Sequence, residues 1–402
     1  MKSIMLKIQV MSMLLNVVLM PISSALAVIF GYICLISSAL LPMELIRYKG
    51  NHVRRKQFLI IFTFVIIIIL NSWKSFLEIQ NEEMENVMKS CISFFSFTMS
   101  ICVGGISYRE NDLKFYFQIV RLFSIVFILY TILPFGFQYT TIGKYGYQQF
   151  TLSMGNPNAT ATKILFCITI LVIEVGIINN VWVRRSDIVL ILCLLYTIIK
   201  LESRTALLCA LTCIVSGILL KVKVKKWMIN MVWIIPLAFI PVQILFQEIS
   251  MLEFMNKSLA SGRDTLFSEF INQIKLSPLS FILGDFGANQ LSNCHNIIFT
   301  LVYNFGFVGT GLYFVFWKNE NERFKASISN VSNYAWLGWL VFVIHSMAEA
   351  APMSGAFTFA PMIIVLNRMT KDRMLVIDGS EIRYDLEVKT YIKDKNKVKY
   401  DE

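Results

Sequence analysis

Residues 54–73 read RRKQFLIIFTFVIIIILNSW, so that three basic side chains are followed by an uncharged, mostly apolar run from residue 57 onward. A helix of roughly 17 to 25 apolar residues is long enough to cross the hydrocarbon core of a bilayer. Because the run follows directly on a basic cluster, it predicts a transmembrane helix that begins on the cytoplasmic side.

Similar apolar runs recur along most of the chain. Of its 402 residues, 56% are hydrophobic and 16% are charged, which lies outside the usual range of soluble proteins. We therefore predict an all-α, polytopic integral membrane protein with about twelve transmembrane helices. Besides 57–73, the predicted spans are two between Lys7 and Glu44, and then 91–107, 114–134, 159–180, 187–201, 204–220, 227–247, 295–317, 333–349 and 351–366.

The N-terminal apolar run has two interpretations. Lys2 and Lys7 precede it, and Ala25-Leu26-Ala27 is typical of a signal-peptide cleavage site. The run continues beyond that point to Leu41. We expect an uncleaved pair of helices hinged near Pro21, with a cleaved signal peptide as the alternative.

Clusters of Lys and Arg predict the orientation of the spans. When the spans are counted from the basic loop at 47–56, every later cluster falls on the same, cytoplasmic side. The net charge of +11 then reflects topology, and we expect no nucleic-acid partner. The predicted division is a transmembrane domain over 1–366, with a large external loop at 248–294, and a charged cytoplasmic tail over 367–402. The other predicted external segments are 74–90, 135–158, 202–203 and the turn near 350.

The cysteines and the long external loop do not indicate a particular chemistry. Most of the eight cysteines lie within apolar runs and none forms a Cys-x-x-Cys pair, so we expect neither disulfides nor a metal site. In the long external loop, apolar residues at helical spacing predict an amphipathic helix that lies on the membrane surface or packs on the spans beneath it. These residues are Leu266, Phe267, Phe270, Ile271 and Ile274.

Polar groups near the outer ends of membrane spans are costly unless they face a cavity. The predicted topology, derived without using them, places all such groups on the outer side. They are Gly155-Asn156-Pro157-Asn158, Glu202-Ser203-Arg204, Gly262-Arg263-Asp264, His295-Asn296, and His345 to Glu349.

Each group alone has an ordinary structural explanation. Asn158 is a suitable helix cap, Arg204 can reach lipid headgroups, Arg263 lies in a solvated loop, and a single His295 is commonly a packed residue. Because the predicted topology places all of these groups on the same side of the membrane, together they favour a binding site. Arginine recognises phosphate through planar, bidentate hydrogen bonds, so the set indicates a phosphate-bearing anionic ligand.

The order of these motifs over about residues 150–310 resembles the O-antigen and capsular polysaccharide polymerase and O-antigen ligase family (Wzy/WaaL type). Thr205 stands where the family often has glycine, and Phe267 where it often has tryptophan. The matching motifs are Gly155-Asn156-Pro157-Asn158, Ser203-Arg204, Gly262-Arg263, Leu283-Gly284-Asp285-Phe286-Gly287, and His295-Asn296 followed by Gly306, Gly309 and Gly311.

The resemblance implies a membrane glycosyltransferase of the GT-C-like type in the bacterial cytoplasmic membrane. The donor would be a polyprenyl-diphosphate-linked oligosaccharide, transferred with inversion on the outer face. No soluble cofactor or metal is implied. Flippase and chain-length regulator proteins are the implied protein partners.

The resemblance also implies residue roles. Arg204 and Arg263 would neutralise the departing diphosphate. His295 would act as general base toward the attacking hydroxyl or orient the acceptor. The residues expected to bind substrate or to hold the turns around it are Asn156, Asn158, Ser203, Asp264 and Asn296.

Other functions stay open at this stage. A ligase would use the same chemistry with a different acceptor. We expect a polymerase, because a capsule or surface-polysaccharide locus is the commoner setting for chains of this family. A lipid-linked oligosaccharide flippase would need polar groups nearer the bilayer midplane. Glu174 is an acidic residue well inside a predicted span, and the sequence assigns it no basic partner. A receptor or purely structural role would leave the outward arginines and histidine without a shared purpose.

Overall fold

The computed structural model describes the chain in part. The longer described stretches are 2–40, 110–133, 139–142, 147–152, 157–178, 180–219, 296–326 and 332–348. The shorter ones are residues 62, 66, 227–228, 234, 253–254, 257–258, 269, 272, 282, 284, 374–378 and 381–384. The predicted spans at 91–107 and 351–366, most of 57–73 and 227–247, and the predicted amphipathic helix of the external loop lie outside these residues.

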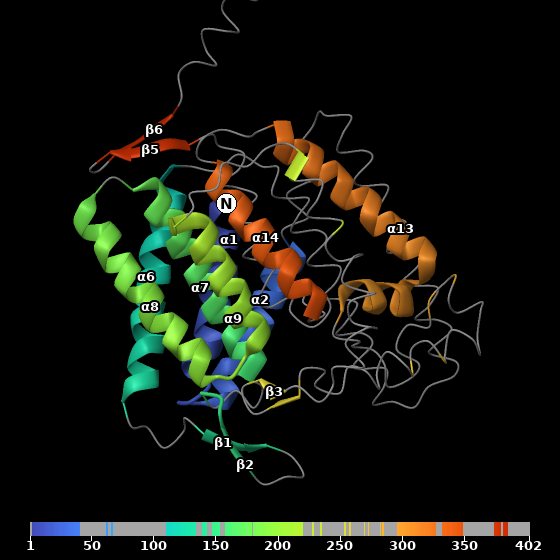
Figure 1. Cartoon of the computed structure of the whole chain (residues 1–402), viewed down its shortest axis with the longest axis horizontal. Coiled ribbons are helices and arrows are strands. Elements are labelled where there is room, and N and C mark those ends of the chain that lie inside the picture. Colours follow the sequence, from blue (N-terminus) through green and yellow to red (C-terminus); the bar gives the residue numbers. More distant parts are fainter. Residues whose placement is uncertain are drawn as a thin grey trace, which may run out of the picture.

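The described residues are mostly helical (Figure 1). Each apolar run that they include forms a helix close to its predicted position. The helices are α1 (Lys2–Leu19), α2 (Ser24–Leu40), α6 (Glu110–Ile132), α7 (Pro157–Ile177), α8 (Val181–Lys200), α9 (Arg204–Ile214), α13 (Ile297–Ala326) and α14 (Ser332–Ala348).

The first two helices form a hairpin. α1 ends at Leu19 and α2 begins at Ser24, so the break includes Pro21, as predicted. Proline lacks the N–H that a continuing helix needs, and the amide of Ile22 instead donates to the Leu19 carbonyl at 3.0 Å. Asn16 reinforces the hairpin, because its Nδ2 donates to the Ala27 carbonyl at 2.7 Å.

α7 is the central helix of the bundle. It contacts α1, α6, α8, α9 and α14, and its residues from Thr160 to Val175 are all buried. An apolar helix enclosed on all sides fits a position at the middle of a helical assembly. Figure 1 shows α6, α8, α9 and α14 close to it, whereas α13 lies apart.

The packing beside α7 is tight at one glycine. α9 continues into a single π-helical turn, η3 (Val215–Leu219), which contains Gly217. A Cβ at Gly217 would come within 2.6 Å of Val172 on α7 and 2.7 Å of Leu337 on α14. Three helices therefore meet where only a hydrogen atom fits.

Two described helices, over Phe115–Ile132 and Pro157–Ile177, are long and apolar enough to cross a membrane. Shorter apolar helices cover Lys7–Leu19, Ser24–Cys34, Arg204–Leu219 and Trp336–Met347. The predicted count of about twelve spans is not established by the described residues. What they establish is a helical protein with a weak indication of membrane association.

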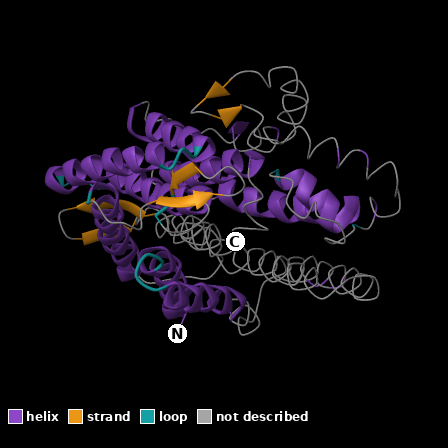
Figure 2. Cartoon of the chain, turned by 90° about the horizontal axis from the view of Figure 1, so that it is seen from below, coloured by secondary structure: helices purple, strands orange, loops and turns teal. Residues whose placement is uncertain are grey.

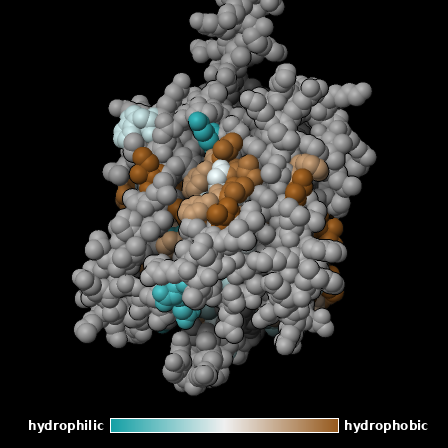
Figure 3. Space-filling model, turned by 90° about the vertical axis from the view of Figure 1, so that its right-hand side faces the viewer, coloured by the Kyte–Doolittle hydropathy of each residue, from teal (hydrophilic) through white to brown (hydrophobic). Residues whose placement is uncertain are grey.

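Large apolar side chains also lie on the outer surfaces of the bundle. Figure 3 shows such residues in brown on the face that it presents. Exposed apolar side chains on α6, α8 and α9 include Leu122, Ile125, Leu129, Val189, Leu192, Tyr196, Leu208 and Leu211. The three helices thus expose apolar side chains, while the charged side chain of Asp187 on α8 is fully buried.

Three short antiparallel hairpins accompany the helices, and Figure 2 shows them as small additions to a helical body. The all-α prediction omitted them. Tyr139 packs edge-on against Phe150 across the first hairpin, with ring centroids 5.5 Å apart. Aromatic and β-branched residues favour such pairing, but runs of two to five residues are too short for a strand pattern to be recognised. The pairs are β1 (Tyr139–Ile142) with β2 (Tyr147–Phe150), β3 (Glu253–Phe254) with β4 (Lys257–Ser258), and β5 (Met374–Asp378) with β6 (Glu381–Tyr384).

α13 has a sharp bend at Gly306. This residue has φ 63° and ψ −173°, which divides the helix into two segments. Such a backbone conformation is essentially restricted to glycine. The bend therefore requires glycine at this position.

Candidate functional site

Four of the predicted site residues lie in the described part of the structure: Asn158, Ser203, Arg204 and Asn296. The other predicted site residues, Asn156, Arg263, Asp264 and His295, lie outside it.

The beginning of α7 is joined to the end of α14. Asn158 is the second residue of α7, so the interpretation of its side chain as a helix cap does not hold. Its carbonyl accepts a hydrogen bond from the Thr162 hydroxyl at 2.7 Å. The same hydroxyl oxygen lies 3.1 Å from Nε2 of His345, and both side chains are buried.

The beginning of α13 is attached to the same end of α14. Asn296 is fully buried, and its Oδ1 accepts from the amides of Ile298 and Phe299 at 2.9 and 3.2 Å. Its Nδ2 donates to the Met347 carbonyl at 3.1 Å. Asn296 therefore caps α13 and holds it against α14, which is the turn-holding role expected for this residue type.

A tight turn places Ser203 and Arg204 at the start of α9. α8 ends at Lys200, and Glu202 adopts a left-handed backbone conformation with φ 52°. This lets the chain reverse direction within three residues, 201–203. Ser203 is 3% exposed and its hydroxyl makes no capping hydrogen bond, while Arg204, the first residue of α9, is half-buried.

Contacts along α9 and α14 show that Arg204 lies at the same end as His345. The two helices are antiparallel, because Cys209 Sγ lies 3.8 Å from the Val341 carbonyl while Gly217 lies against Leu337. Moving five residues from Cys209 to Arg204 covers about 7.5 Å along the axis. The equivalent step on α14 runs from Val341 to Ser346, so Arg204 and Ser346 are at the same level.

Backbone strain occurs at this end as well. Among the described residues, the non-glycine residues with positive φ are Leu152, at 51°, and Glu202. Leu152 lies just after the β1–β2 hairpin, and the neighbouring Thr151 carbonyl accepts from Thr160 of α7 at 3.2 Å. Left-handed non-glycine residues are associated with functional sites.

The polar groups gathered at this end are suited to binding an anion with hydroxyl groups. Arg204 supplies a permanent positive charge, and Ser203 supplies a hydroxyl. Ser346 is 2% exposed, and its hydroxyl has no hydrogen-bond partner among the described residues. An unsatisfied buried hydroxyl calls for an explanation, and a ligand group is one.

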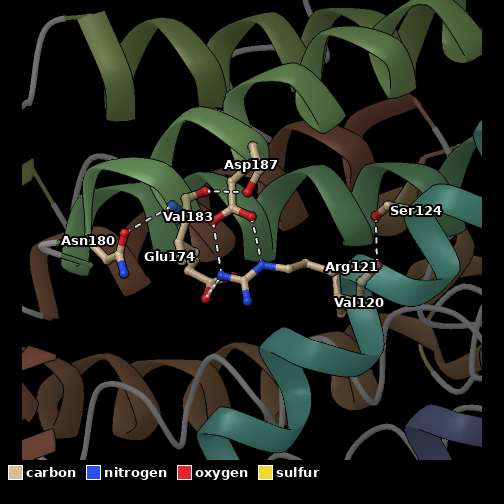
Figure 4. A network of polar contacts seen from close by, with 8 residues as sticks. Val120, Arg121, Ser124, Glu174, Asn180, Val183 and Asp187 are labelled. Atoms are coloured by element: carbon tan, nitrogen blue, oxygen red, sulfur yellow. Dashed lines mark hydrogen bonds and ion pairs between the residues drawn. The ribbon is translucent and has the colours of Figure 1, made fainter. Parts of the chain in front are cut away.

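A second polar network lies toward the opposite end of the bundle and was not predicted. Figure 4 shows Arg121 of α6 between Glu174 of α7 and Asp187 of α8. The guanidinium Nε donates to Asp187 Oδ1 at 2.8 Å and one terminal nitrogen donates to Oδ2 at 3.3 Å. That same terminal nitrogen donates to Oε1 of Glu174. The sequence analysis singled out Glu174 alone, and the charges of Arg121 and Asp187 within predicted spans are the further signal that could have found the network.

Lys163 is a further buried charge that sequence reasoning missed. It is 3% exposed, and its Nζ donates to Oδ1 of Asn16 at 2.8 Å. The contact links α7 to the α1–α2 hairpin close to their predicted outer ends. A lysine in an otherwise apolar run is its sequence signal.

Comparison with models of known protein families and with curated proteins gives no match to this chain.

Proposed function

We propose that this protein is a polytopic membrane enzyme that polymerises surface polysaccharide from polyprenyl-diphosphate-linked oligosaccharide repeat units. The transfer takes place on the outer face of the bacterial cytoplasmic membrane. The observation that carries this proposal is the meeting of Arg204, Asn296, Ser346 and the start of α7 at one end of the helical bundle.

A membrane location is supported by the contrast between the apolar outer surface of the bundle and its buried charged side chains. The outward faces of α6, α8 and α9 are apolar, whereas Lys163, Glu174 and Asp187 are buried. Trp182, near the beginning of α8, is 77% exposed and lies 5.7 Å from the Arg185 guanidinium. Toward the other end, Lys200 Nζ lies 5.7 Å from the Tyr196 ring. Aromatic and basic side chains at both ends of a helix are typical of membrane interfaces.

In the proposed reaction, a sugar hydroxyl attacks the anomeric carbon of the donor glycan. The bond from that carbon to the diphosphate oxygen breaks, and the lipid diphosphate leaves with the electron pair. Arg204, together with Arg263, neutralises the charge on the diphosphate. His295, which precedes Asn296 in the chain, accepts the hydroxyl proton.

The test is polymerisation by purified protein in nanodiscs supplied with lipid-linked repeat units. We expect a ladder of longer lipid-linked glycans from the wild type. Arg204→Ala and Arg204→Lys should both lose about 100-fold or more in rate, because lysine lacks the bidentate geometry. Arg184→Lys on the exposed start of α8 is the matched control and should behave as wild type.

Three results would overturn parts of the proposal. Wild-type rates from Arg204→Lys would exclude a bidentate phosphate contact. Full activity of His295→Ala in correctly inserted protein would exclude this histidine as the base. Absence of a ladder together with transfer of glycan to another added acceptor would identify a ligase.

The buried Arg121–Glu174–Asp187 network favours a second candidate, a flippase for lipid-linked oligosaccharides. Ionisable residues inside membrane spans often mark transport pathways. Movement of labelled lipid-linked oligosaccharide across sealed vesicles, abolished by Arg121→Ala and without chain growth, would support this function.

A further inference from the structure

The Arg121–Glu174–Asp187 network contains one more acidic group than its basic group neutralises. Asp187 uses both oxygens on Arg121, at 2.8 and 3.3 Å, which forms a bidentate and electrically neutral pair. Glu174 shares a nitrogen that Asp187 already contacts. If both carboxyl groups were ionised, the network would carry a net negative charge.

Burial makes that extra charge costly. Glu174 is 1% exposed and Asp187 is 0% exposed, while the Arg121 side chain is 24% exposed. The second oxygen of Glu174, Oε2, is buried and has no hydrogen-bond partner among the described residues. A buried charge with an unsatisfied oxygen is unstable, and such a group usually takes up a proton instead.

Among the basic side chains that the structure describes on the surrounding helices, Arg121 alone pairs with Glu174, and Arg184 and Arg185 of α8 are exposed. Lys7 of α1 lies over the Phe115 ring, 5.0 Å from its centroid. Arg204 of α9 and His345 of α14 are at the other end of the bundle, and Lys163 of α7 donates to Asn16. Arg121 is therefore the described basic side chain that contacts Glu174.

We propose that Glu174 is a buried proton-binding site whose carboxyl group holds a proton in the assembled bundle. The proton sits on Oε2, and Oε1 accepts from Arg121. Loss of that proton to solvent creates a second carboxylate that competes with Asp187 for the guanidinium. The contact between α7 and the α6–α8 pair then weakens as the pH rises. This inference does not rest on glycosyl transfer and applies equally to an enzyme or a transporter.

Infrared spectroscopy of the purified full-length protein tests the proton directly. At neutral pH we expect the C=O stretching band of a protonated carboxyl, shifted by deuterium exchange and lost on alkaline titration. Glu174→Gln should lack this band, whereas Glu202→Gln, in the turn at the other end of the bundle, should retain it. A wild-type spectrum without the band would overturn the proposal.

Thermal unfolding gives a second, independent reading from the same samples. Glutamine is close in shape to a protonated glutamate and takes up no proton on folding, so Glu174→Gln should leave the unfolding midpoint at neutral pH equal to or above that of the wild type. Asp187→Asn removes the carboxylate paired with Arg121 and should lower the midpoint clearly. Equal lowering by the two variants would show that Glu174 is ionised, and the proposal would be wrong.

Discussion

The Nε2 atom of His345 lies 3.1 Å from the hydroxyl oxygen of Thr162, so that a buried polar contact joins the first turns of α7 to the last turn of α14. These residues are 183 positions apart in the chain. The contact brings the segment that begins with Pro157 to the helix whose end also holds Asn296. It therefore organises the end of the bundle where the candidate site lies.

Thr162→Val tests the energetic value of that contact. The substitution keeps the branched shape but removes the hydroxyl, leaving the His345 nitrogen without this partner. We expect a loss of about 1–3 kcal/mol in the free energy of unfolding, measured by denaturant titration in detergent. Thr212→Val is the control, because its exposed hydroxyl bonds only to the Leu208 carbonyl of its own helix at 2.8 Å. Equal effects at both sites would contradict a structural role for the Thr162–His345 contact.

Gly217→Ala tests the close packing of three helices. The added methyl group would lie 2.6 Å from Val172 and 2.7 Å from Leu337, well inside van der Waals contact. Overpacking of this kind costs about 1–3 kcal/mol, and we expect a lower unfolding midpoint. Gly311→Ala provides a matched comparison, because a Cβ there meets nothing within 4 Å. A Gly217→Ala protein as stable as the Gly311→Ala protein would show that the helices separate readily.

Asn296→Asp tests whether Asn296 only caps α13 or also joins α13 to α14. Aspartate can still accept from the amides of Ile298 and Phe299, but it cannot donate to the Met347 carbonyl. It also places a charge at a fully buried position, so we expect a loss of at least about 2 kcal/mol. At the exposed cap of α8, the Asn180 side chain accepts from the amides of Trp182 and Val183, and Asn180→Asp should be close to neutral. Similar losses for the two variants would mean that the bond to Met347 contributes nothing.

Asn16→Ala and Lys163→Met should differ in severity. Removing Asn16 leaves the buried Lys163 ammonium without the acceptor at 2.8 Å, which we expect to cost about 1.5–3 kcal/mol. Methionine removes the charge while keeping a similar volume, so Lys163→Met should be the milder change. Unfolding midpoints of the two variants check this order. The reverse order would indicate that Lys163 has a stabilising role beyond its bond to Asn16.

Local sequence was sufficient to predict most of the described helices. The run predicted as a span at 159–180 forms α7 over Pro157–Ile177, and the predicted break near Pro21 separates α1 from α2. Hydrophobic runs of this length specify a helix regardless of their partners. The hairpins were missed because their strands are shorter than any recognisable alternating pattern.

Contacts between distant residues were less predictable. Glu174 was singled out from the sequence, but its partners Arg121 and Asp187 lie on two other helices, and nothing in their spacing assigns them to it. The common end shared by Arg204, Asn296 and the start of α7 was predicted from the distribution of basic residues alone. The contribution of Thr162 and Ser346 depends on side-chain packing, which only the folded arrangement reveals.

The bend at Gly306 divides α13 into two helical segments. The shorter one, which begins at Ile297, takes its position from the bond between Asn296 and Met347. In the bilayer that we propose, a thicker or thinner membrane changes the tilt of a long helix. Because the backbone of Gly306 is not helical, we expect such a change in the longer segment to be absorbed at residue 306. The candidate site would then be insulated from variation in the surrounding lipid.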